Sequence, residues 1–480
     1  MEDDKKEIGI TVKKNEDFSE WYTQVVLKSK LADYAPMKGF MVFMPYSYAI
    51  WEKIMSFFDK KIKELGHKNA YFPTLIPESF LRKEASHFQG FAPETFVVTK
   101  SGDDNLSEPL VVRPTSETIM YYSYSKWVRS WRDLPILINQ WNSVLRAEIK
   151  MTKPFIRTSE FLWQEGHTVH ATKEEADEEV FRILKLYKEL AEEYLAIPVL
   201  EGKKSEMEKF AGALYTTTIE ALMPDGKALQ AGTSHNLGQN FARAFEIKFL
   251  DKDGLEKYAW QTSWGISTRL IGALIMIHGD DKGLVLPPKI APIQIVIVPI
   301  NFHENKEVLE QAGKIKNELE KKNYRVELDD REDYTPGWKF NDWELKGVPL
   351  RIEIGPKDLQ KHQIVISRRD NDKKIVIKED FVGEIERTLV DIQNNLFEKA
   401  KKFLLDNIRD VSNREDFIKT LEEKRGFIRI SWCDRRECEE RIKEDTGATS
   451  RVISFNEKPK EKCDYCGTEA KVVAYFAKSY

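Results

Sequence analysis

The segment from Val144 to His167 restricts the possible folds most, because its charged and aromatic residues alternate with the period of a β-strand. Successive side chains of a strand point to opposite faces, so Arg146 and Glu148 share one face. A solvent-facing strand would waste the rings, whereas a core-facing strand would bury the charges at considerable cost. The pattern therefore predicts a β-hairpin, with a loop over residues 149–156, whose one face binds an anionic, partly aromatic ligand. The returning strand is expected to contribute Arg157, Phe161, Trp163, Glu165 and His167 to that face.

Helical and strand-like segments mix over residues 1–287. Apolar residues from Ile50 to Leu65 keep helical spacing up to Gly66, which supplies a stop signal, and a second such run spans Val180 to Tyr194. Strand-like runs lie between them, at Pro135–Trp141 and Arg157–Thr168. Helices and neighbouring strands of this kind predict an α+β domain with a largely antiparallel sheet.

Two further units follow a proline-rich boundary. Leu286-Pro287-Pro288 is expected to end the first domain, because proline cannot continue a helix or strand. Residues 288–405 then alternate strands and helices, which predicts a small α/β domain, and residues 406–480 form a third unit. The expected elements of the middle domain are strands at Ile293–Ile300, Tyr324–Leu328 and Ile364–Ser367 and a helix at Lys306–Lys322.

A second informative segment runs from Trp260 to Arg269, ahead of the helical Leu270–His278. Gly265 is expected to permit a tight turn, and Ser267 is a candidate helix cap. Arg269 falls in the first helical turn, where the helix dipole disfavours a cation unless an anion binds there. The segment therefore predicts an anion site, with an ordinary capped helix as the open alternative.

All four cysteines lie in the last tenth of the chain. Two close pairs about twenty-five residues apart are the arrangement that a tetrahedral Cys₄ zinc site needs. Four thiolates close the coordination shell, so the metal would be structural. Four unrelated thiols or two disulfides are the alternatives. The candidate ligands are Cys433, Cys438, Cys463 and Cys466.

The remaining composition bears on location. The first residues are charged and lack an apolar core, so we expect no secretory signal. The longest apolar stretch, Ile290–Ile300, contains two prolines and a glutamine and is too short to span a bilayer. We therefore expect a cytoplasmic protein without membrane association. The net charge of −4 neither indicates nor excludes a nucleic-acid partner.

Together these segments resemble a known family. The hairpin and the Trp260–His278 segment resemble motifs 2 and 3 of class II aminoacyl-tRNA synthetases. The helix through Ile62 and the following Tyr71–Pro77 resemble motif 1, which in that family builds a homodimer interface. Three further runs resemble prolyl-tRNA synthetases rather than their seryl, threonyl or glycyl relatives. These runs are Arg113–Glu117, Phe161–His167 and Gln230–His235.

The resemblance implies a fold and an activity. The fold would be a class II antiparallel-sheet catalytic domain, an α/β anticodon-binding domain and a small zinc-binding α+β domain. The last belongs to the archaeal and eukaryotic type, in which the terminal tyrosine, here Tyr480, brings its carboxylate toward the active site. The activity would be the attachment of L-proline to tRNA(Pro) with ATP and Mg²⁺. Prolyl-adenylate would form first, and the prolyl group would then move to the tRNA 3′ end.

The resemblance also assigns residues. Arg146 and Arg269 would be catalytic, and Thr115 and Glu117, on an expected extended strand, would bind the proline ammonium. The ATP-binding set would be Arg146, Glu148, Arg157, Thr158, Phe161, Gln230, Thr233, Ser267 and Arg269. The proline-binding set would be Thr115, Glu117, Arg146, Trp163, Glu165, His167, Phe210, His235 and Ser263. The anticodon set would be Glu344, Arg351 and Lys357, with the two cations reading the guanines of the proline anticodon.

Three alternatives stay open at the level of sequence: a class II synthetase for another small amino acid, a non-catalytic synthetase-like tRNA-binding protein, and, more remotely, a zinc-dependent DNA-binding protein. Threonine is disfavoured because threonyl relatives use a zinc-bound cysteine in the active site, and no cysteine precedes Cys433. Residues 164–229 are too few for an editing insertion. Because apolar pockets discriminate weakly between small side chains, we expect some misactivation of alanine and cysteine.

Overall fold

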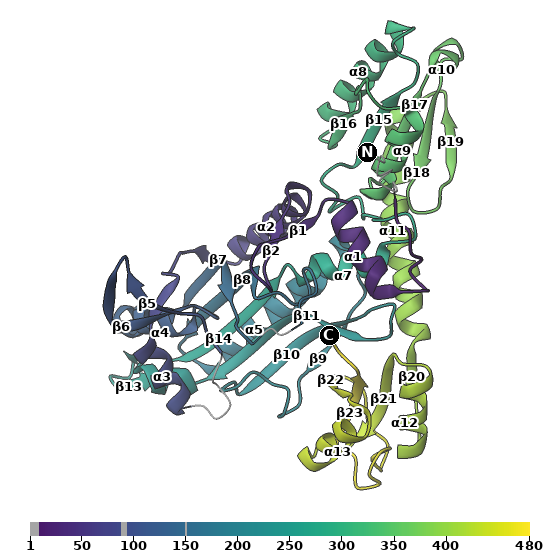
Figure 1. The fold of residues 1–480 in the computed structure, drawn as a ribbon. Coiled ribbons are helices and arrows are strands. Elements are labelled where there is room, and N and C mark those ends of the chain that lie inside the picture. Colours follow the sequence, from purple (N-terminus) through teal and green to yellow (C-terminus); the bar gives the residue numbers. More distant parts are fainter. Residues whose placement is uncertain (1–8, 88–93, 149–150) are drawn as a thin grey trace.

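The computed structural model describes residues 9–87, 94–148 and 151–480. The charged N-terminal residues and the start of the predicted loop, residues 149–150, lie outside the described residues. For description we keep the predicted divisions and call residues up to 287 the large unit, residues 288–405 the middle unit and residues 406–480 the C-terminal unit. In Figure 1 a broad sheet occupies the large unit, with the middle unit above it and the C-terminal unit below it. Among the described residues, no helix combines the length and the apolar character that crossing a bilayer requires.

An eleven-stranded sheet is the frame of the molecule, in the order β20-β21-β23-β22-β9-β10-β11-β14-β8-β7-β3. Its longest pairing is the β7–β8 hairpin, which runs from Ile136↔Val169 to Leu145↔Glu160. The predicted hairpin is confirmed, but β7 ends at Leu145 and β8 begins at Glu160. The predictions that Arg146 and Glu148 lie on the first strand and Arg157 on the returning strand are therefore wrong. The strands of the large unit in this sheet are β3 (Lys68–Asn69), β7 (Ile136–Leu145), β8 (Glu160–His170), β9 (Leu200–Lys203), β10 (Tyr215–Leu222), β11 (Ala228–Gly238) and β14 (Trp260–Ser267).

Helices cover one face of this sheet because their apolar stripes match it. In α2 the buried side chains Ile50, Ile54 and Phe58 repeat at helical spacing, and the helix ends before Gly66, whose φ is +94°. The predicted helices are confirmed there and in α5, which continues into a π turn at Leu190–Tyr194. The helices of the large unit are α1 (Phe18–Lys28), α2 (Pro45–Glu64), α3 (Glu78–His87), α4 (Glu117–Trp127), α5 (Lys173–Glu189), α6 (Asn240–Phe245) and α7 (Arg269–His278), with a 3-10 turn at Trp131–Asp133.

Three small sheets complete the large unit: β1-β2, β4-β6-β5 and β12-β13. Their strands are β1 (Ala32–Tyr34), β2 (Met41–Phe43), β4 (Leu75–Pro77), β5 (Val97–Ser101), β6 (Asp104–Val112), β12 (Lys248–Leu250) and β13 (Glu256–Tyr258).

The middle unit is a five-stranded sheet in the order β16-β15-β17-β18-β19. Its first three strands run parallel and the last two antiparallel, so the predicted βαβ rhythm is confirmed. Its elements are β15 (Ile295–Pro299), α8 (Lys306–Lys321), β16 (Val326–Leu328), α9 (Pro336–Leu345), β17 (Leu350–Ile354), α10 (Pro356–Gln360), β18 (Ile364–Arg368) and β19 (Lys374–Ile377).

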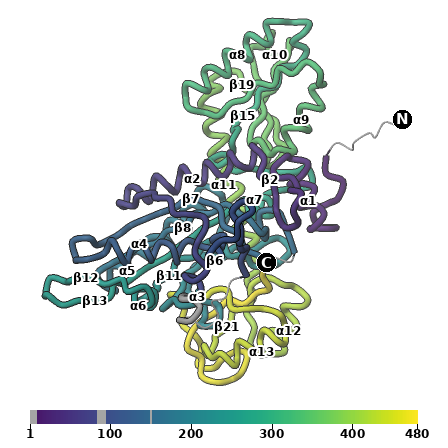
Figure 2. The backbone as a smooth tube through the Cα atoms, turned by 60° about the vertical axis from the view of Figure 1, so that its left-hand side comes forward, coloured from purple at the N-terminus to yellow at the C-terminus, as the bar shows by residue number. Residues whose placement is uncertain are grey.

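The long helix α11 (Phe381–Asp406) leads from the middle unit to the C-terminal unit along the side of the large one (Figures 1 and 2). Although the sequence marks the C-terminal unit as separate, its strands extend the large sheet, because β22 pairs with β9 at Ile453↔Lys203. Gly202 makes this approach possible: a Cβ there would lie 2.2 Å from the carbonyl oxygen of Ile453. The remaining elements are β20 (Ile408–Asp410), α12 (Arg414–Glu423), β21 (Phe427–Trp432), α13 (Arg436–Thr446), β22 (Thr449–Ile453) and β23 (Val472–Ala477).

We predict that Gly202→Ala weakens the junction between β9 and β22, because the added methyl group meets backbone rather than a flexible side chain. Overpacking of this kind costs about 1–3 kcal/mol. Scanning calorimetry should show a lower unfolding midpoint or a C-terminal transition that separates from the main one. Gly313→Ala in α8 is the matched control, since its Cβ meets nothing within 4 Å. An equal response to both substitutions would contradict the role assigned to Gly202.

Candidate active site

One face of the central strands, opposite α2 and α5, borders a cavity of about 600 Å³. The lining contains the whole predicted proline-binding set: Thr115, Glu117, Arg146, Trp163, Glu165, His167, Phe210, His235 and Ser263. It also contains most of the predicted ATP-binding set: Arg146, Glu148, Phe161, Gln230, Thr233, Ser267 and Arg269. These predicted residues come from six separate stretches of sequence and meet around one space.

Two residues of the predicted ATP-binding set lie outside this lining. Arg157 precedes β8 and is exposed, and Thr158 is buried, with its hydroxyl donating to the carbonyl oxygen of Glu160 at 2.6 Å. Both belong to the segment that leads out of the loop, so their positions depend on the turn rather than on the strand alternation.

Two local predictions near the cavity are wrong. Glu117 is the first residue of helix α4, and Thr115 precedes its cap Ser116, so the two do not share an extended strand. Gly265 lies within β14 opposite Glu165, not in a tight turn. Glycine serves close packing there, because a Cβ would stand 3.1 Å from the carbonyl oxygen of Gln164 and near the Trp163 ring.

Glu165 is the hub of a buried hydrogen-bond network. Its Oε2 accepts bonds from the Thr115 hydroxyl at 3.1 Å, from the Ser116 amide at 3.0 Å and from His167 Nε2 at 3.0 Å. Its Oε1 accepts from Asn142 at 2.8 Å. Burial raises the pKa of Glu165, but these donors outweigh it and hold the pKa at about 2. The cavity therefore keeps a fixed negative charge at this end.

Beside this carboxylate stands an apolar and neutral wall. The Phe210 ring lies 4.9 Å from the His235 ring, and His235 Nδ1 shares a 2.8 Å hydrogen bond with the Thr216 hydroxyl. Burial, and then the charge of His167, lower the pKa of His235 to about 3. His235 is consequently uncharged near neutral pH. An acid next to a flat apolar wall suits a compact ring that carries a cation.

Two arginines also line the cavity. The Arg146 guanidinium lies 5.3 Å from the Phe161 ring centre and 5.6 Å from that of Trp163, which holds the group in place by cation–π contact. Arg269 begins helix α7, and its Nε donates to the carbonyl oxygen of Ile156 at 3.3 Å. Burial and the neighbouring charge of Arg146 lower the pKa of Arg269 to about 10. Two arginines that repel each other in this way are stabilised by a bound anion.

Several lining residues carried no signal in the sequence. Glu208 and Thr216 belong to no recognised motif, although Glu208 lies two positions from the predicted Phe210. Their place in the lining follows from how the chain turns between β9 and β10, which spacing alone does not reveal. The residues that the sequence analysis missed are Glu94, Pro114, Glu208, Thr216, Ala231, Gly232, Trp264, Gly265 and Ile266.

The structure joins two of the three residues predicted to read the anticodon. Arg351 Nη1 donates to Glu344 Oε1 at 3.0 Å, and the same guanidinium pairs with Glu353 and lies 4.1 Å from the Phe340 ring centre. Lys357 lies in the short helix α10, which follows β17, and its side chain is exposed.

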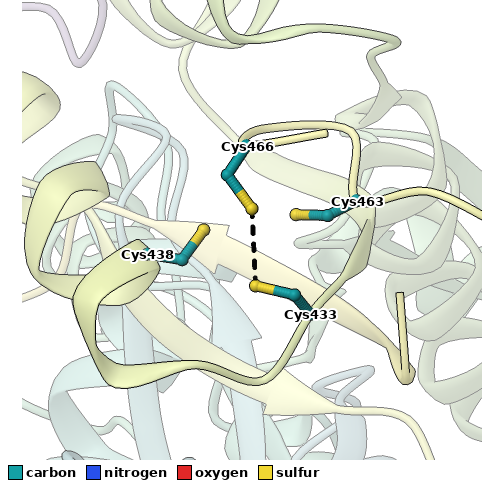
Figure 3. A group of neighbouring side chains, drawn as sticks. All are labelled: Cys433, Cys438, Cys463 and Cys466. Atoms are coloured by element: carbon teal, nitrogen blue, oxygen red, sulfur yellow. Dashed lines mark hydrogen bonds between the residues drawn. The ribbon is translucent and has the colours of Figure 1, made fainter. Parts of the chain in front are cut away.

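The four cysteines converge at the edge of the C-terminal unit (Figure 3). Their sulfur atoms lie within 4.8 Å of one another, and two of them, of Cys433 and Cys466, are 3.5 Å apart. A tetrahedral ion with metal–sulfur bonds of about 2.3 Å would place its sulfur ligands about 3.8 Å apart. The cluster therefore fits a tetrahedral metal ion.

Tyr480 ends the chain beside β11. Its hydroxyl donates to Asp225 Oδ2 at 2.7 Å, and its amide donates to the carbonyl oxygen of Ala228 at 3.2 Å. Lys153 lies 4.8 Å from its ring centre. Tyr480 is not among the residues that line the cavity, so the predicted approach of its carboxylate to the active site stays a prediction.

Comparisons with known proteins agree along the whole chain. Three family profiles match: "tRNA synthetase class II core domain (G, H, P, S and T)" over residues 96–278, "Anticodon binding domain" over 294–388, and "Prolyl-tRNA synthetase, C-terminal" over 414–480. The proline–tRNA ligase of Natranaerobius thermophilus is 57% identical over 97% of this chain and 97% of its own. That of Cenarchaeum symbiosum is 55% identical over 98% and 100%.

A solved structure is similar throughout. The crystal structure of prolyl-tRNA synthetase from Cryptosporidium parvum, complexed with halofuginone and AMPPNP, matches with a TM-score of 0.95 and 45% sequence identity. The match covers 98% of this chain and 100% of the other.

We predict that His235→Asn makes stability less dependent on acid. The folded pKa of His235 lies below its ordinary value of 6.5, so the unfolded chain binds more protons between pH 6.5 and about 3. This contribution to stability is complete above pH 6.5 and is lost as pH falls, by up to about 1.4 kcal/mol per pH unit. The unfolding midpoint of the variant should therefore fall less steeply between pH 6.5 and 4.5. His303→Asn, at an exposed site, should keep the original slope; an unchanged slope in His235→Asn would refute the assignment.

Proposed function

The chain belongs to the prolyl-tRNA synthetase family, and on that premise we propose that it attaches L-proline to tRNA(Pro) in two steps. In the first, proline and ATP form prolyl-adenylate and release pyrophosphate. In the second, the 3′-terminal ribose of the tRNA attacks the activated carbonyl group and AMP leaves. The observation that carries the proposal is that one cavity lining combines a buried carboxylate and an apolar wall with the two arginines Arg146 and Arg269.

Proline is placed at the acidic end. Its secondary ammonium would lie near Thr115, Glu117 and the network of Glu165, while Trp163, Phe210 and His235 would enclose the ring. The Glu165 carboxylate is already held by hydrogen bonds from Thr115, Ser116, Asn142 and His167. The carboxylate that faces the ammonium would therefore not have to move when proline binds.

ATP is placed beside the two arginines. Phe161 would stack on adenine, and Arg269 would hold the distal phosphates. Arg146, between the two subsites, would contact the proline carboxylate and the α-phosphate together. As the carboxylate attacks phosphorus, negative charge grows on the phosphoryl oxygens, and the Arg146 guanidinium stabilises it. The substrate supplies the nucleophile, so the enzyme contributes positioning rather than a covalent intermediate. Glu148 and Thr158 would contact the adenine region, and Mg²⁺ bound with ATP would neutralise charge on the phosphates.

We assign the remaining parts by the same reasoning. The middle unit would read the anticodon through Glu344, Arg351 and Lys357. Cys433, Cys438, Cys463 and Cys466 would bind a structural zinc ion. Domain divisions near residues 287 and 405 and a cytoplasmic location stay predictions.

A homodimer is part of the proposal. Large apolar side chains are exposed on and beside the elements that resemble motif 1, for example Tyr71 at 70% and Tyr34 at 57%. Exposed apolar surface of this kind often marks an interface. The others in this region are Met37, Val42, Tyr48, Leu75 and Val97.

We predict that ATP–pyrophosphate exchange is strongest with proline when proline, alanine, cysteine, threonine and serine are compared. Alanine and cysteine should give weaker exchange that still exceeds a blank without amino acid, because the chain has no editing insertion between residues 164 and 229. Exchange led by another amino acid would overturn the pocket assignment. Binding of tRNA without exchange by any amino acid would favour a non-catalytic tRNA-binding protein.

We predict that Arg351→Lys weakens tRNA charging without affecting exchange. Lysine cannot pair with Glu344 and a guanine edge as a planar guanidinium does, and such a pair is worth about 1–3 kcal/mol. The KM for tRNA(Pro) should rise at least tenfold, while the KM values for proline and ATP stay constant. Arg387→Lys, an exposed arginine of α11 that pairs with Glu384, is the control. A change in exchange kinetics, or none in charging, would contradict anticodon recognition by Arg351.

A further inference from the structure

The C-terminal unit contacts the wall of the active site. Residues 204–214, between β9 and β10, form this wall and contribute Glu208 and Phe210 to the cavity lining. The far end of the wall is fixed by the central sheet, because the Phe210 amide donates to the Thr216 hydroxyl at 3.0 Å. The near end, from residue 204 to 208, is fixed largely by residues from beyond position 430.

Arg451 of β22 makes the central contact. Its guanidinium binds the fully buried Glu220 through bonds of 2.9 to 3.1 Å, and Lys204 binds the same carboxylate at 2.6 Å. The Arg451 backbone carbonyl also accepts a bond from Lys204 at 3.1 Å. Two cations thus surround one buried anion at the junction of the units.

The same guanidinium reaches a second carboxylate. Arg451 Nη1 lies 3.8 Å from Glu208 Oε2, at a position where the Arg451 side chain is 8% exposed and that of Glu208 is 23% exposed. Lys204 and Arg451 together bring two positive charges to the single negative charge of Glu220, so Glu208 supplies the second negative charge at this junction. A planar guanidinium can serve both carboxylates, whereas an ammonium group cannot.

A second link runs in parallel. The Ser205 hydroxyl donates to Glu439 of α13 at 2.7 Å and accepts a bond from the Glu208 amide at 3.3 Å. Ser205 and Glu439 are both buried. Glu208 is therefore held at its side chain by Arg451 and at its backbone through Ser205, two positions before the ring that faces His235.

We propose that Arg451 is a positioning residue for the amino-acid end of the active site, acting through Glu208 on the wall that carries Phe210. The inference rests on the proposed function, since it takes this end of the cavity to be the proline subsite. Proline affinity then depends on a residue in a unit that contributes nothing to the cavity lining. Arg451 lies within electrostatic reach of Arg269, so the KM for ATP should stay constant only in a variant that keeps the positive charge at position 451.

A double-mutant cycle tests this. Arg451→Lys keeps a charge beside Glu220 but loses the reach to Glu208, and Glu208→Gln removes the second carboxylate while leaving Glu220 paired. Each should raise the KM for proline in pyrophosphate exchange roughly tenfold, or about 1.4 kcal/mol, with little change in kcat or in the KM for ATP. Because both substitutions remove the same contact, the KM for proline in the double variant should be no higher than in the more impaired single variant.

The controls separate positioning from simple stability. Arg429→Lys alters another arginine–carboxylate pair of the C-terminal unit, with Asp410 at 2.6 and 2.7 Å, and should leave all three constants unchanged. Multiplying effects in the double variant, equal losses for proline and ATP, or an unaltered KM in Glu208→Gln would each overturn the proposal. If Arg451→Lys fails to fold, an unaltered KM for proline in Glu208→Gln still overturns the proposal. Wild-type protein without proline exchange would instead refute the proposed function.

Discussion

The cavity depends on a row of small residues along β14. Ser263, Gly265 and Ser267 stand opposite His167, Glu165 and Trp163 of β8, so each large or charged side chain faces a neighbour that leaves room. Antiparallel pairing fixes this register, and a shift by one residue would turn the whole set to the other face. The opposite face of β14 carries Trp264, which packs against Phe58 and His67 under the sheet. The alternating residues of β14 therefore determine both the packing of the core under the sheet and the cavity on its other face.

The lining of that cavity carries charges of both signs. A carboxylate that is buried without partners would take up a proton, yet Glu165 stays ionised because donors from three elements point at it. Burial lowers the pKa of both Arg146 and Arg269, and the charge of Arg146 lowers the pKa of Arg269 further. A bound anion would stabilise both cations. A zwitterionic amino acid and a polyphosphate nucleotide would complement these charges, and in the proposed arrangement the reacting carboxylate and α-phosphate would lie beside Arg146.

Most of this arrangement could be predicted because alternation on a strand is a strong local signal. Trp163, Glu165 and His167 share a face for that reason, and the spacing of the cysteines likewise gave the ligand set of the C-terminal cluster. The predictions failed where geometry depends on a turn or a distant contact. Arg157 does not lie on the strand face because β8 begins at Glu160, three residues after it. Glu117 begins helix α4, which the spacing of apolar residues in the sequence did not predict. The joining of β22 to β9 depends on Gly202 and Ile453, about 250 residues apart, and no local pattern connects them.

The central claim is that one cavity holds proline and the nucleotide together, with Arg146 between them. Calorimetric titration with a non-hydrolysable prolyl-adenylate analogue, in which a sulfamate replaces the phosphate, tests it most directly. The account predicts that wild-type protein binds the analogue at least about a hundredfold more tightly than proline alone, and that Arg146→Gln loses most of this advantage. An analogue that binds no more tightly than proline, or equally well to both proteins, would contradict it.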